Sequence, residues 1–598
     1  MQTRTATHNP AAYALLMVLC VIATLGVLAA ATVNRSMTNA KLNDRSNDLS
    51  VGTSAAEAAT EKVYAMMAYD FQNFGVGGVS INLNQYRTNV PNAGEDPYWN
   101  NFVFSDGQGN LNHIYVGFVS NYSGALPSQY PGLYTAQAPL YRIIANVQRK
   151  GSTVTSACQQ DALLSLVPIT QYAIFYNGLL EFSTCAAMTV NGRVHANGAI
   201  DTGTSASLTF NATVTTTSTL GSPANNGQGP WTFPGGTFKG SPNYKTNVPS
   251  VTLSIGSTNV HSVIDIPPSG ESPTSTTGQG RAYNQAQTVL LVSNTVVTMR
   301  IENSVNNQVP GADPAPLTLT SATNVSVLAT NFPFLTLTNS FTDQREGKTI
   351  LTTQIDVAKY GQWIKTNNSI LTKFPSGSGT YPTILYVADN RTASGSQLTG
   401  VRLLNGTAPP VNGGLGWSVA TPNPLYVWGN YNCTNAAYLG TTNTTTTAPC
   451  AFMSDALTVL SPSWKDSASL NYNGGSSIPN ASSATVNAAI LTGIVPSTGT
   501  SSTTFSGGVH NLPRLLENWT GDTLTLNTSI MNLFSSQRAT HVFVNPGTYY
   551  NPPTRQFSYD LNFLDPAKQP PGIPCALVPI RLNYALPPPN CVTYVVKP

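Results

Sequence analysis

Histidine is the residue of this 598-residue chain best suited to acid–base or metal chemistry, and its spacing favours neither. A metal site built on one helix needs HxxxH or HExxH spacing, and neither pattern occurs. We therefore predict no metal, no cofactor and no catalytic residue. His195 lies in a predicted chain corner and His510 precedes Asn511, and we interpret both as structural side chains that bond to neighbouring turns. The six histidines are His8, His113, His195, His261, His510 and His541.

Paired carboxylates would indicate sugar chemistry, because glycoside hydrolysis needs two carboxyl groups about 5–9.5 Å apart. The chain has no Asp-Asp pair, and acids such as Asp265, Asp389 and Asp455 are isolated. Isolated acids can still converge in a fold, and Tyr426 and Trp428 would stack against sugars if they were exposed. We predict a protein that is not an enzyme. The alternative is a membrane-tethered enzyme on a β-solenoid that binds or cleaves polysaccharide.

Two short segments are rich in oxygen ligands of the kind that calcium prefers. Glu95 and Asp96 precede Pro97, and Asp560 and Asp565 flank four residues. Neither segment has the twelve-residue signature of a calcium loop. We interpret both as solvated turns.

Six of the seven cysteines fall into three pairs that are close in the sequence, while Cys20 lies within an apolar run. No CxxC motif occurs, so zinc and thiol-redox chemistry have little support. Short loops close at the least entropic cost, so neighbours are the expected partners. An even number of paired cysteines is typical of an oxidising compartment, so we predict an extracytoplasmic protein. The predicted disulfides are Cys158–Cys185, Cys433–Cys450 and Cys575–Cys591.

The amino-terminal run Ala11–Val33 is uncharged and mostly apolar, with Leu19 and Ile22 near its middle. About 20 such residues cross a bilayer as a helix. No proline occurs from Ala11 to Val90, so we predict one continuous helix of roughly 60 residues, about 90 Å long. A cleaved signal peptide is the competing interpretation, but its apolar region would span about 7–15 residues. We predict a membrane anchor that continues into a water-exposed stem.

Charged residues make up 9% of the chain, against about 25% in typical domains. The net charge is +3 with no cluster of Lys and Arg, so no nucleic-acid partner is expected. Alternating segments such as Leu140–Val147 and Thr288–Ile301 predict strands bounded by turn residues.

One internal correspondence bears on the fold: Met188–Val194 matches Leu208–Val214 at an offset of 20 residues. Short strands with Asn and Gly corners are typical of stacked coils. We predict a mainly β protein with a long amino-terminal α-helix and a parallel β-solenoid-like body, with a β-sandwich as the alternative. Pro513–Trp519 is predicted to be a short amphipathic helix that packs an end of the body.

Four domains follow from these patterns. Residues 1–70 form a transmembrane and stem helix, and residues 71–180 form an α+β or β segment. Residues 181–508 form the solenoid-like body, and residues 509–598 form a carboxy-terminal closing segment.

The amino-terminal stretch resembles the PilX-type minor pilins, through Leu25–Ala30 and the small-residue block Ser54–Ala59. In that family the apolar half-helix packs into the core of a type IV pilus or related machine, and a globular part lies outside. Later blocks are similar to the large carboxy-terminal regions of some bacterial pilin-like proteins, a resemblance that implies no activity. These blocks are Gly192–Gly198, Pro424–Asn432, Gly508–Trp519, Phe557–Phe563 and Pro570–Pro574.

One departure from the prepilin pattern concerns the membrane helix. No Gly precedes Gly26, and the first acidic residue is Asp44, whereas prepilins usually carry a Gly before the cleavage point and a Glu at the fifth mature position. A tip position or a permanently anchored protein fits this departure.

The resemblance implies a structural or adhesive component of a type IV pilus or pseudopilus system, anchored in the inner membrane with an extracytoplasmic body, on a pilus or the cell surface. Its expected partners are the membrane, other pilins or pilus assembly proteins, and surface glycans.

Overall fold

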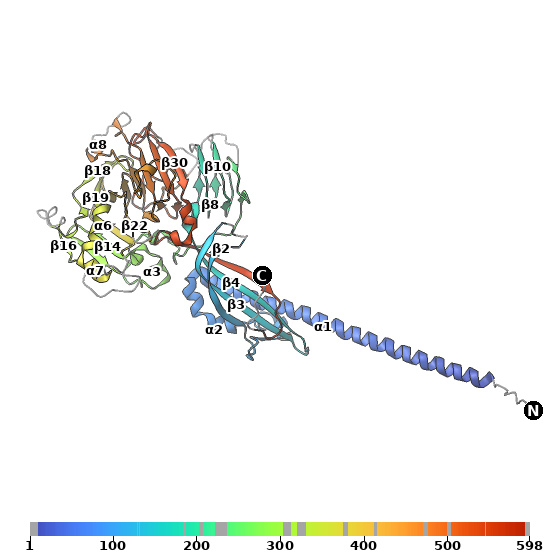
Figure 1. The fold of residues 1–598 in the computed structure, drawn as a ribbon. Coiled ribbons are helices and arrows are strands. Elements are labelled where there is room, and N and C mark those ends of the chain that lie inside the picture. The colour runs from blue at the N-terminus through green and yellow to red at the C-terminus, as the bar shows by residue number, and fades with distance from the viewer. Residues whose placement is uncertain are drawn as a thin grey trace, which may run out of the picture.

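The computed structural model describes residues 10–591 with short gaps, and its architecture is a long helix, a small antiparallel sheet and a large β body (Figure 1). The prediction of a mainly β protein with a long amino-terminal helix is confirmed. The gaps are residues 128–129, 131, 183–186, 203–206, 222–235, 303–312, 320–329, 375–380, 412–414, 471–476, 499–503 and 545.

Helix α1 (Pro10–Ile81) is 72 residues long, about 108 Å at 1.5 Å per residue. Residues 10–47 are exposed, and the half that follows buries one stripe of mainly small residues. The helix continues past the predicted end near residue 70 because no proline intervenes, and a kink at Gly75, whose φ of 67° is not helical, separates its last turns from the rest. The buried stripe is Gly52, Ala55, Ala56, Ala59, Thr60, Val63, Met67 and Phe71, with Val79 buried beyond the kink.

The carboxy-terminal half of α1 covers one face of a five-stranded antiparallel sheet. The order is β1-β3-β4-β31, and β2 pairs with another part of β3. A Cβ at Gly52 would lie 2.6 Å from Ser156 Oγ on β4, so glycine is what lets the helix approach this strand. The strands are β1 (Phe102–Ser105), β2 (Tyr115–Ala125), β3 (Tyr134–Arg149), β4 (Thr155–Pro168) and β31 (Cys575–Ala585).

The carboxy-terminal end of the chain therefore returns to the amino-terminal part, since β31 pairs with β4 from Cys575↔Pro168 to Ala585↔Gln159. We call residues 10–168 and 575–591 the helix–sheet module, and residues 169–574 the body. The predicted closing segment, residues 509–598, is divided between the two, with β28, β29 and β30 in the body and β31 in the module. The module also holds α2 (Leu83–Thr88) and η1 (Pro97–Asn101).

The largest sheet of the body has twelve strands in the order β13-β11-β8-β5-β29-β27-β24-β22-β20-β14-β15-β16. Its pairs are parallel from β13 to β14 and antiparallel from β14 to β16. Its strands are β5 (Tyr172–Tyr176), β8 (Arg193–Ala196), β11 (Val214–Thr216), β13 (Tyr244–Lys245), β14 (Thr288–Val292), β15 (Val296–Ile301), β16 (Leu317–Thr318), β20 (Ile384–Asp389), β22 (Trp417–Thr421), β24 (Cys450–Ser454), β27 (Ala489–Thr492) and β29 (Ile530–Asn532).

Four smaller sheets complete the body, in the orders β17-β19-β21-β23-β25 with β18 beside β19, β26-β28-β30, β12-β10-β7 and β6-β9. Their strands are β17 (Leu335–Thr336), β18 (Ser340–Asp343), β19 (Lys348–Asp356), β21 (Gln397–Leu404), β23 (Leu425–Trp428), β25 (Leu457–Leu460), β26 (Ala484–Asn487), β28 (Thr523–Thr528), β30 (Thr554–Tyr559), β7 (Met188–Val190), β10 (Leu208–Phe210), β12 (Thr237–Phe238), β6 (Leu180–Glu181) and β9 (Ile200–Asp201).

Short helices lie between the strands of the body. They are η2 (Ile169–Gln171), η3 (Val260–Val263), α3 (Thr276–Gly280), α4 (Ala282–Gln285), α6 (Val357–Thr366), α7 (Asn368–Lys373), η4 (Ala436–Tyr438), α8 (Asp466–Leu470), η7 (Val509–Asn511), η8 (Leu561–Leu564) and η9 (Pro566–Lys568).

The internal correspondence found in the sequence is confirmed as strand pairing. Met188 pairs with Leu208 and Val194 with Val214, both in parallel register. Elsewhere β17 and β18 run antiparallel to β19, as β15 does to β14. The sheets are thus mixed, and this topology establishes neither the predicted solenoid nor the alternative sandwich.

The predicted helix at Pro513–Trp519 is wrong, because this segment is irregular and joins its neighbours through isolated β-bridges. Arg514 forms a parallel bridge to Thr458, and Asn518 forms one to Asn480. Neighbouring chain segments therefore form hydrogen bonds with the backbone groups of this segment. In a helix, these groups would bond to one another instead. Its apolar side chains are buried as predicted, namely Leu515, Leu516 and Trp519.

Candidate functional sites

The apolar end of α1 is the first candidate, because it projects from the rest of the chain with its side chains uncovered (Figure 1). Leu19 and Ile22 are 58% and 60% exposed, and Ala11 and Val33 are exposed as well. In the described chain, this is the one helix long and apolar enough to cross a membrane. Thr24 and Thr32 donate their hydroxyls to carbonyls one turn earlier, which satisfies their polar groups within the helix.

All the described cysteines have free thiols, and Cys185 lies outside the described residues. Cys158 is buried beneath α1, with its Sγ 3.7 Å from Thr60 Oγ1. Burial raises the pKa of the Cys158 thiol to about 11 and that of Cys450 to about 12, so neither is a nucleophile at neutral pH.

The other two predicted disulfides differ in geometry. Cys575 opens the 11-residue strand β31 opposite Pro168, and Cys591 follows Asn590, whose N–H donates to Asn146 Oδ1 near the other end of the sheet. A disulfide needs Cα atoms within about 7 Å, so this fold keeps these two cysteines apart. The segments that carry Cys433 and Cys450 are in contact, because the neighbouring Asn432 donates its Nδ2 to Ala448 O at 2.7 Å. Their disulfide stays a prediction.

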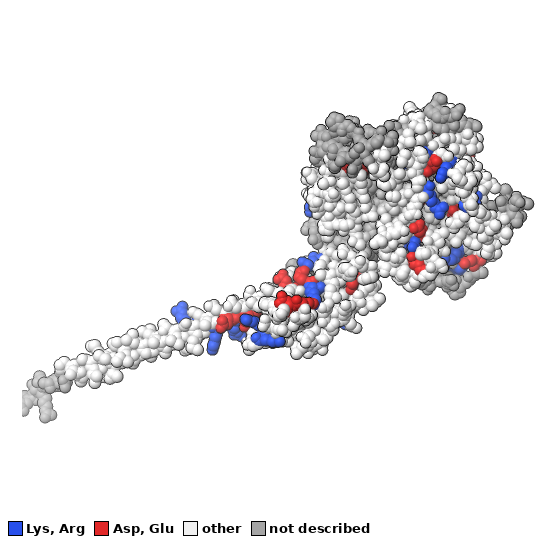
Figure 2. All heavy atoms as spheres, turned by 180° about the vertical axis from the view of Figure 1, so that it is seen from behind, with Lys and Arg blue, Asp and Glu red and all other residues white. Residues whose placement is uncertain are grey.

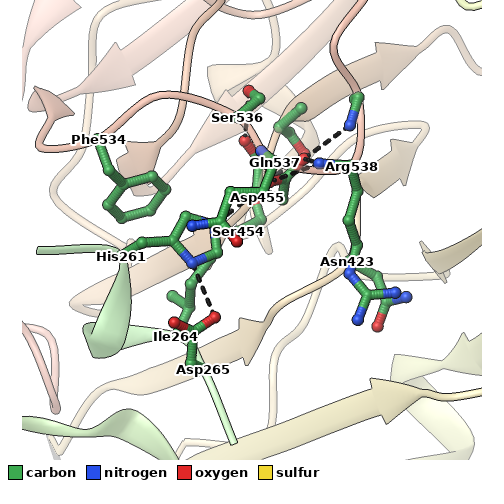
Figure 3. Close-up of polar contacts among 12 residues, drawn as sticks. His261, Ile264, Asp265, Asn423, Ser454, Asp455, Phe534, Ser536, Gln537 and Arg538 are labelled. Carbon is green, nitrogen blue, oxygen red and sulfur yellow. Dashed lines mark hydrogen bonds and ion pairs between the residues drawn. The ribbon is translucent and has the colours of Figure 1, made fainter. Parts of the chain in front are cut away.

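His261 is the centre of a buried polar cluster (Figure 3). Its Nδ1 lies 2.7 Å from Asp265 Oδ1, and its Nε2 lies 3.3 Å from Asp455 Oδ1. Burial alone would lower the pKa of His261, but the two carboxylates outweigh it and raise the pKa to about 9. The imidazolium is therefore charged at neutral pH and links η3 to the corner after β24.

Asp455 also fixes the loop at residues 537–539, whose backbone N–H groups surround its carboxylate (Figure 3). Gln537 N donates at 2.5 Å, Ala539 N at 2.9 Å and Arg538 N at 3.1 Å. Burial would raise the pKa of Asp455, but the bonds from His261 and these amides lower it. Asp455 is fully buried and its carboxylate is surrounded by protein partners, which suits a structural clamp.

A second buried cluster holds the other end of the same loop. Arg514 Nη1 donates to Glu346 Oε1 at 2.6 Å, and its Nη2 donates to Ala539 O at 2.7 Å. Glu346 also accepts from His541 N. The side chains of Arg514 and Glu346 are 3% and 2% exposed, so this ion pair is almost fully removed from water.

Arg402 is a third buried charge that no local pattern in the sequence indicates. Its guanidinium has no exposed surface and forms a bidentate salt bridge with Asp466, with Nη1–Oδ1 at 2.6 Å and Nη2–Oδ2 at 2.9 Å. It also lies over the rings of Phe341 and Trp428. Tyr426, which we considered as a sugar-stacking residue, is buried and donates its hydroxyl to Asp343.

The remaining predicted acids have structural partners. Asp265 and Asp455 converge on His261, but Asp389 does not join them, because it is held by Arg391 and Thr353. Asp560 and Asp565 cap the short helices η8 and η9 by accepting backbone N–H groups.

In the other predicted turn, Asp96 caps η1 and Glu95 pairs with Lys62. Within the described residues, no group of three or more His, Cys, Asp or Glu side chains is placed to hold a metal.

The two histidines interpreted as structural, His195 and His510, differ in their hydrogen bonding. His195 bonds the neighbouring strand β11, with Nδ1 2.8 Å from Thr215 Oγ1, and its own turn, with Nε2 3.0 Å from Asn197 Oδ1. His510 is also buried, but its Nδ1 has no hydrogen-bond partner in the described chain, and burial lowers its pKa to about 3.

The cavities of the described residues carry few acidic side chains in their linings. Among the better-formed cavities of the described residues, one is lined by Glu181 and another by Asp70. The largest of these, about 680 Å³, lies where the end of α1 meets the body. We call it the junction cavity.

Comparisons with known proteins assign no family. A scan against models of protein families finds no match, and a search of curated proteins finds none either. Among solved structures, the chain is similar to the competence-associated pilin ComZ from Thermus thermophilus, with 11% identity and a TM-score of 0.24. The alignment covers 90% of this chain and 98% of that one, and a likeness with so low a TM-score carries no weight in assigning a fold or function.

Proposed function

We propose that the protein is a membrane-anchored, extracytoplasmic component of a type IV pilus or pseudopilus system. Its role is structural or adhesive, and a position at the pilus tip suits its large body. The anchor lies in the inner membrane, and the partners are other pilins or pilus assembly proteins.

The observation that carries this proposal is the division of α1 into two halves. The stretch Ala11–Val33 of the first half is apolar, uncharged and uncovered, whereas the second half packs through small residues on an antiparallel sheet. A helix built in this way can enter a lipid bilayer or a bundle of like helices while the sheet stays in water. The PilX-type resemblance of Leu25–Ala30 and Ser54–Ala59 belongs to the same proposal.

The proposal treats the protein as non-enzymatic. Its support is that Asp455 and Glu346 are buried against protein partners rather than in a groove. On the face drawn in Figure 2, charged atoms gather over the helix–sheet module and along a band of the body, and most of the remaining body surface is uncharged. A broad neutral polar surface suits contact with other surfaces better than steering of a charged substrate.

We also propose that the body is solenoid-like. Its support is the long run of parallel pairs in the largest sheet, together with ladders of stacked asparagines. Asn518 accepts from Asn551 at 3.0 Å and donates to Asn480 at 3.1 Å, and Asn211 donates to Asn191 at 2.7 Å. Such ladders form when equivalent corners of successive coils lie above one another.

Fractionation of a bacterial host tests the anchor. Leu19→Asp and Ile22→Lys each place a charge at the middle of the membrane span, which costs about 2.5–3.5 kcal/mol on insertion scales. Both variants should therefore be absent from the membrane fraction and from the fraction sheared off the cell surface. Leu19→Ile is the matched control and should distribute like the wild type. A wild-type protein free in the medium, with a new amino terminus near residue 32, would show that α1 is a signal peptide and overturn the proposal.

A further inference from the structure

The junction cavity is formed by both parts of the molecule. The end of α1 around its kink supplies one wall, the loop and helices at residues 253–285 supply another, and the start of β31 closes it. Figure 1 shows α3 of the body beside the end of the module that carries α2. Ligand sites occur preferentially at such boundaries between units, and a volume of about 680 Å³ is within their usual range.

The lining of this cavity carries no Asp, Glu, Lys, Arg or His side chain. A charged ligand would therefore be desolvated there without a compensating partner. The polar lining consists of carboxamides and hydroxyls, which offer both donors and acceptors. The polar side chains are Gln72, Asn73, Asn82, Gln279, Gln285, Ser254, Thr274 and Thr276.

Two of the carboxamides are oriented by contacts on their nitrogen side. Gln279 Nε2 donates to Thr274 O at 2.8 Å, and Gln285 Nε2 donates to Gln279 O at 2.7 Å. Neither side-chain carbonyl oxygen accepts a hydrogen bond from another described residue. Each amide group is planar, so its oxygen is a fixed acceptor for an incoming hydroxyl.

Apolar carbon is exposed on the opposite wall. Phe74 is 51% exposed and Ile81 is 83% exposed, on either side of the glycines that line the cavity after the kink. An exposed aromatic ring is a stacking surface for the C–H face of a sugar, while the amides bond its hydroxyls. We propose that the junction cavity binds a neutral oligosaccharide. This proposal rests on the proposed function and makes a surface glycan the target of the protein.

A peptide fits the cavity less well, because the nearby strand edge is already occupied. Leu577 N donates to Thr252 O, Ser254 N donates to Cys575 O, and Cys575 N donates to Ser254 Oγ. An extended peptide added to this edge would find these backbone groups taken.

Binding is measured by isothermal titration on the purified full chain, held in a zwitterionic detergent without a sugar headgroup. The probes are maltotetraose, cellotetraose and N-acetylchitotetraose, with tetragalacturonate as the charged comparison. We expect at least one neutral probe to bind and tetragalacturonate not to. The double variant Gln279→Ala with Gln285→Ala should weaken binding about tenfold or more, since it removes both oriented acceptors.

Two further variants separate binding in the cavity from binding elsewhere. Gly77→Leu fills space on the helix wall, where a Cβ meets no atom within 4 Å, and should abolish binding while leaving the melting temperature unchanged. Gln362→Ala removes an exposed carboxamide outside the cavity and should bind like the wild type. Failure of all three neutral probes to bind, or equal binding by the double variant, overturns the proposal.

The assay is independent of pilus assembly. If fractionation contradicts the anchor but the sugar still binds, only the proposed function fails. A tetrapeptide of Ser, Thr and Asn that binds in place of the sugars would overturn the ligand class.

Discussion

The helix–sheet module and the body handle charge in opposite ways. The module keeps most of its ionisable side chains at the surface, and its buried charges in the described chain are Asp106 and Asp161. The body buries many more and presents a largely neutral surface on the face drawn in Figure 2. Its buried charged residues are Glu181, Asp201, Arg281, Asp343, Arg345, Glu346, Lys373, Asp389, Arg402, Asp455, Arg514, Glu517 and Asp560.

This difference indicates what stabilises each part. The module has one long helix against one sheet, so apolar burial along a single stripe can hold it together. The body has long connections between short strands, and ion pairs such as Arg514–Glu346 hold distant loops in one register. A buried pair adds little net stability, but loss of one partner leaves an unpaired charge in a low dielectric.

The largest expected effect follows from breaking such a pair. Arg514→Met leaves Glu346 buried without its cation and should destabilise the body by about 3–5 kcal/mol. Hydrogen–deuterium exchange resolved by peptide should show faster exchange in the body and unchanged exchange along the buried stripe of α1. Adding Glu346→Gln to Arg514→Met should recover part of the loss, because no charge is then stranded.

The matched change in the module tests its apolar stripe. Phe71 is fully buried beneath the sheet, so Phe71→Ala should cost about 3–5 kcal/mol and act on the module alone. Phe74, three residues on, is 51% exposed, so Phe74→Ala should leave the unfolding free energy nearly unchanged. Peptide-resolved exchange distinguishes the two, and equal destabilisation would contradict the assignment of the buried face.

The features of the fold that depend on local sequence patterns could be predicted from the sequence. The apolar run, the small-residue block Ser54–Ala59 and the repeat between Met188–Val194 and Leu208–Val214 each correspond to an observed feature. Local spacing could not indicate that Arg514 meets Glu346 across 168 residues, or that His261 meets Asp455 across 194. Nor could it show that β31 returns to β4, because an antiparallel edge strand can come from anywhere in the chain.

A smaller and pH-dependent effect is expected at His261. Its pKa is raised to about 9 in the folded state, so its stabilising contribution is complete below about pH 6.5 and is lost as pH rises toward 9. Asp455 has a lowered pKa, so its contribution is lost only in acid. His261→Gln should therefore cost about 1–3 kcal/mol near pH 6 and much less above pH 9 or so. Urea unfolding of both proteins across this range measures the difference, and a loss independent of pH would contradict the imidazolium.

The smallest effect should come from the exposed ion pairs of the module, and its salt dependence sharpens the comparison. Arg149 lies 3.1 Å from Asp48, with side chains 51% and 20% exposed, and bonds to Ser152 and Arg149 lower the pKa of Asp48. Solvent screens such a pair, so Asp48→Asn should lower the melting temperature only slightly at low salt. In about 1 M salt, where the screening length is about 3 Å, its effect should vanish. Asp466→Asn deprives the buried Arg402 of its anionic partner, leaving only the neutral acceptor Gln354, and should remain destabilising at every salt concentration, because the guanidinium has no exposed surface. Equal salt sensitivity in the two variants would mean that the body's charges are screened like those of the module.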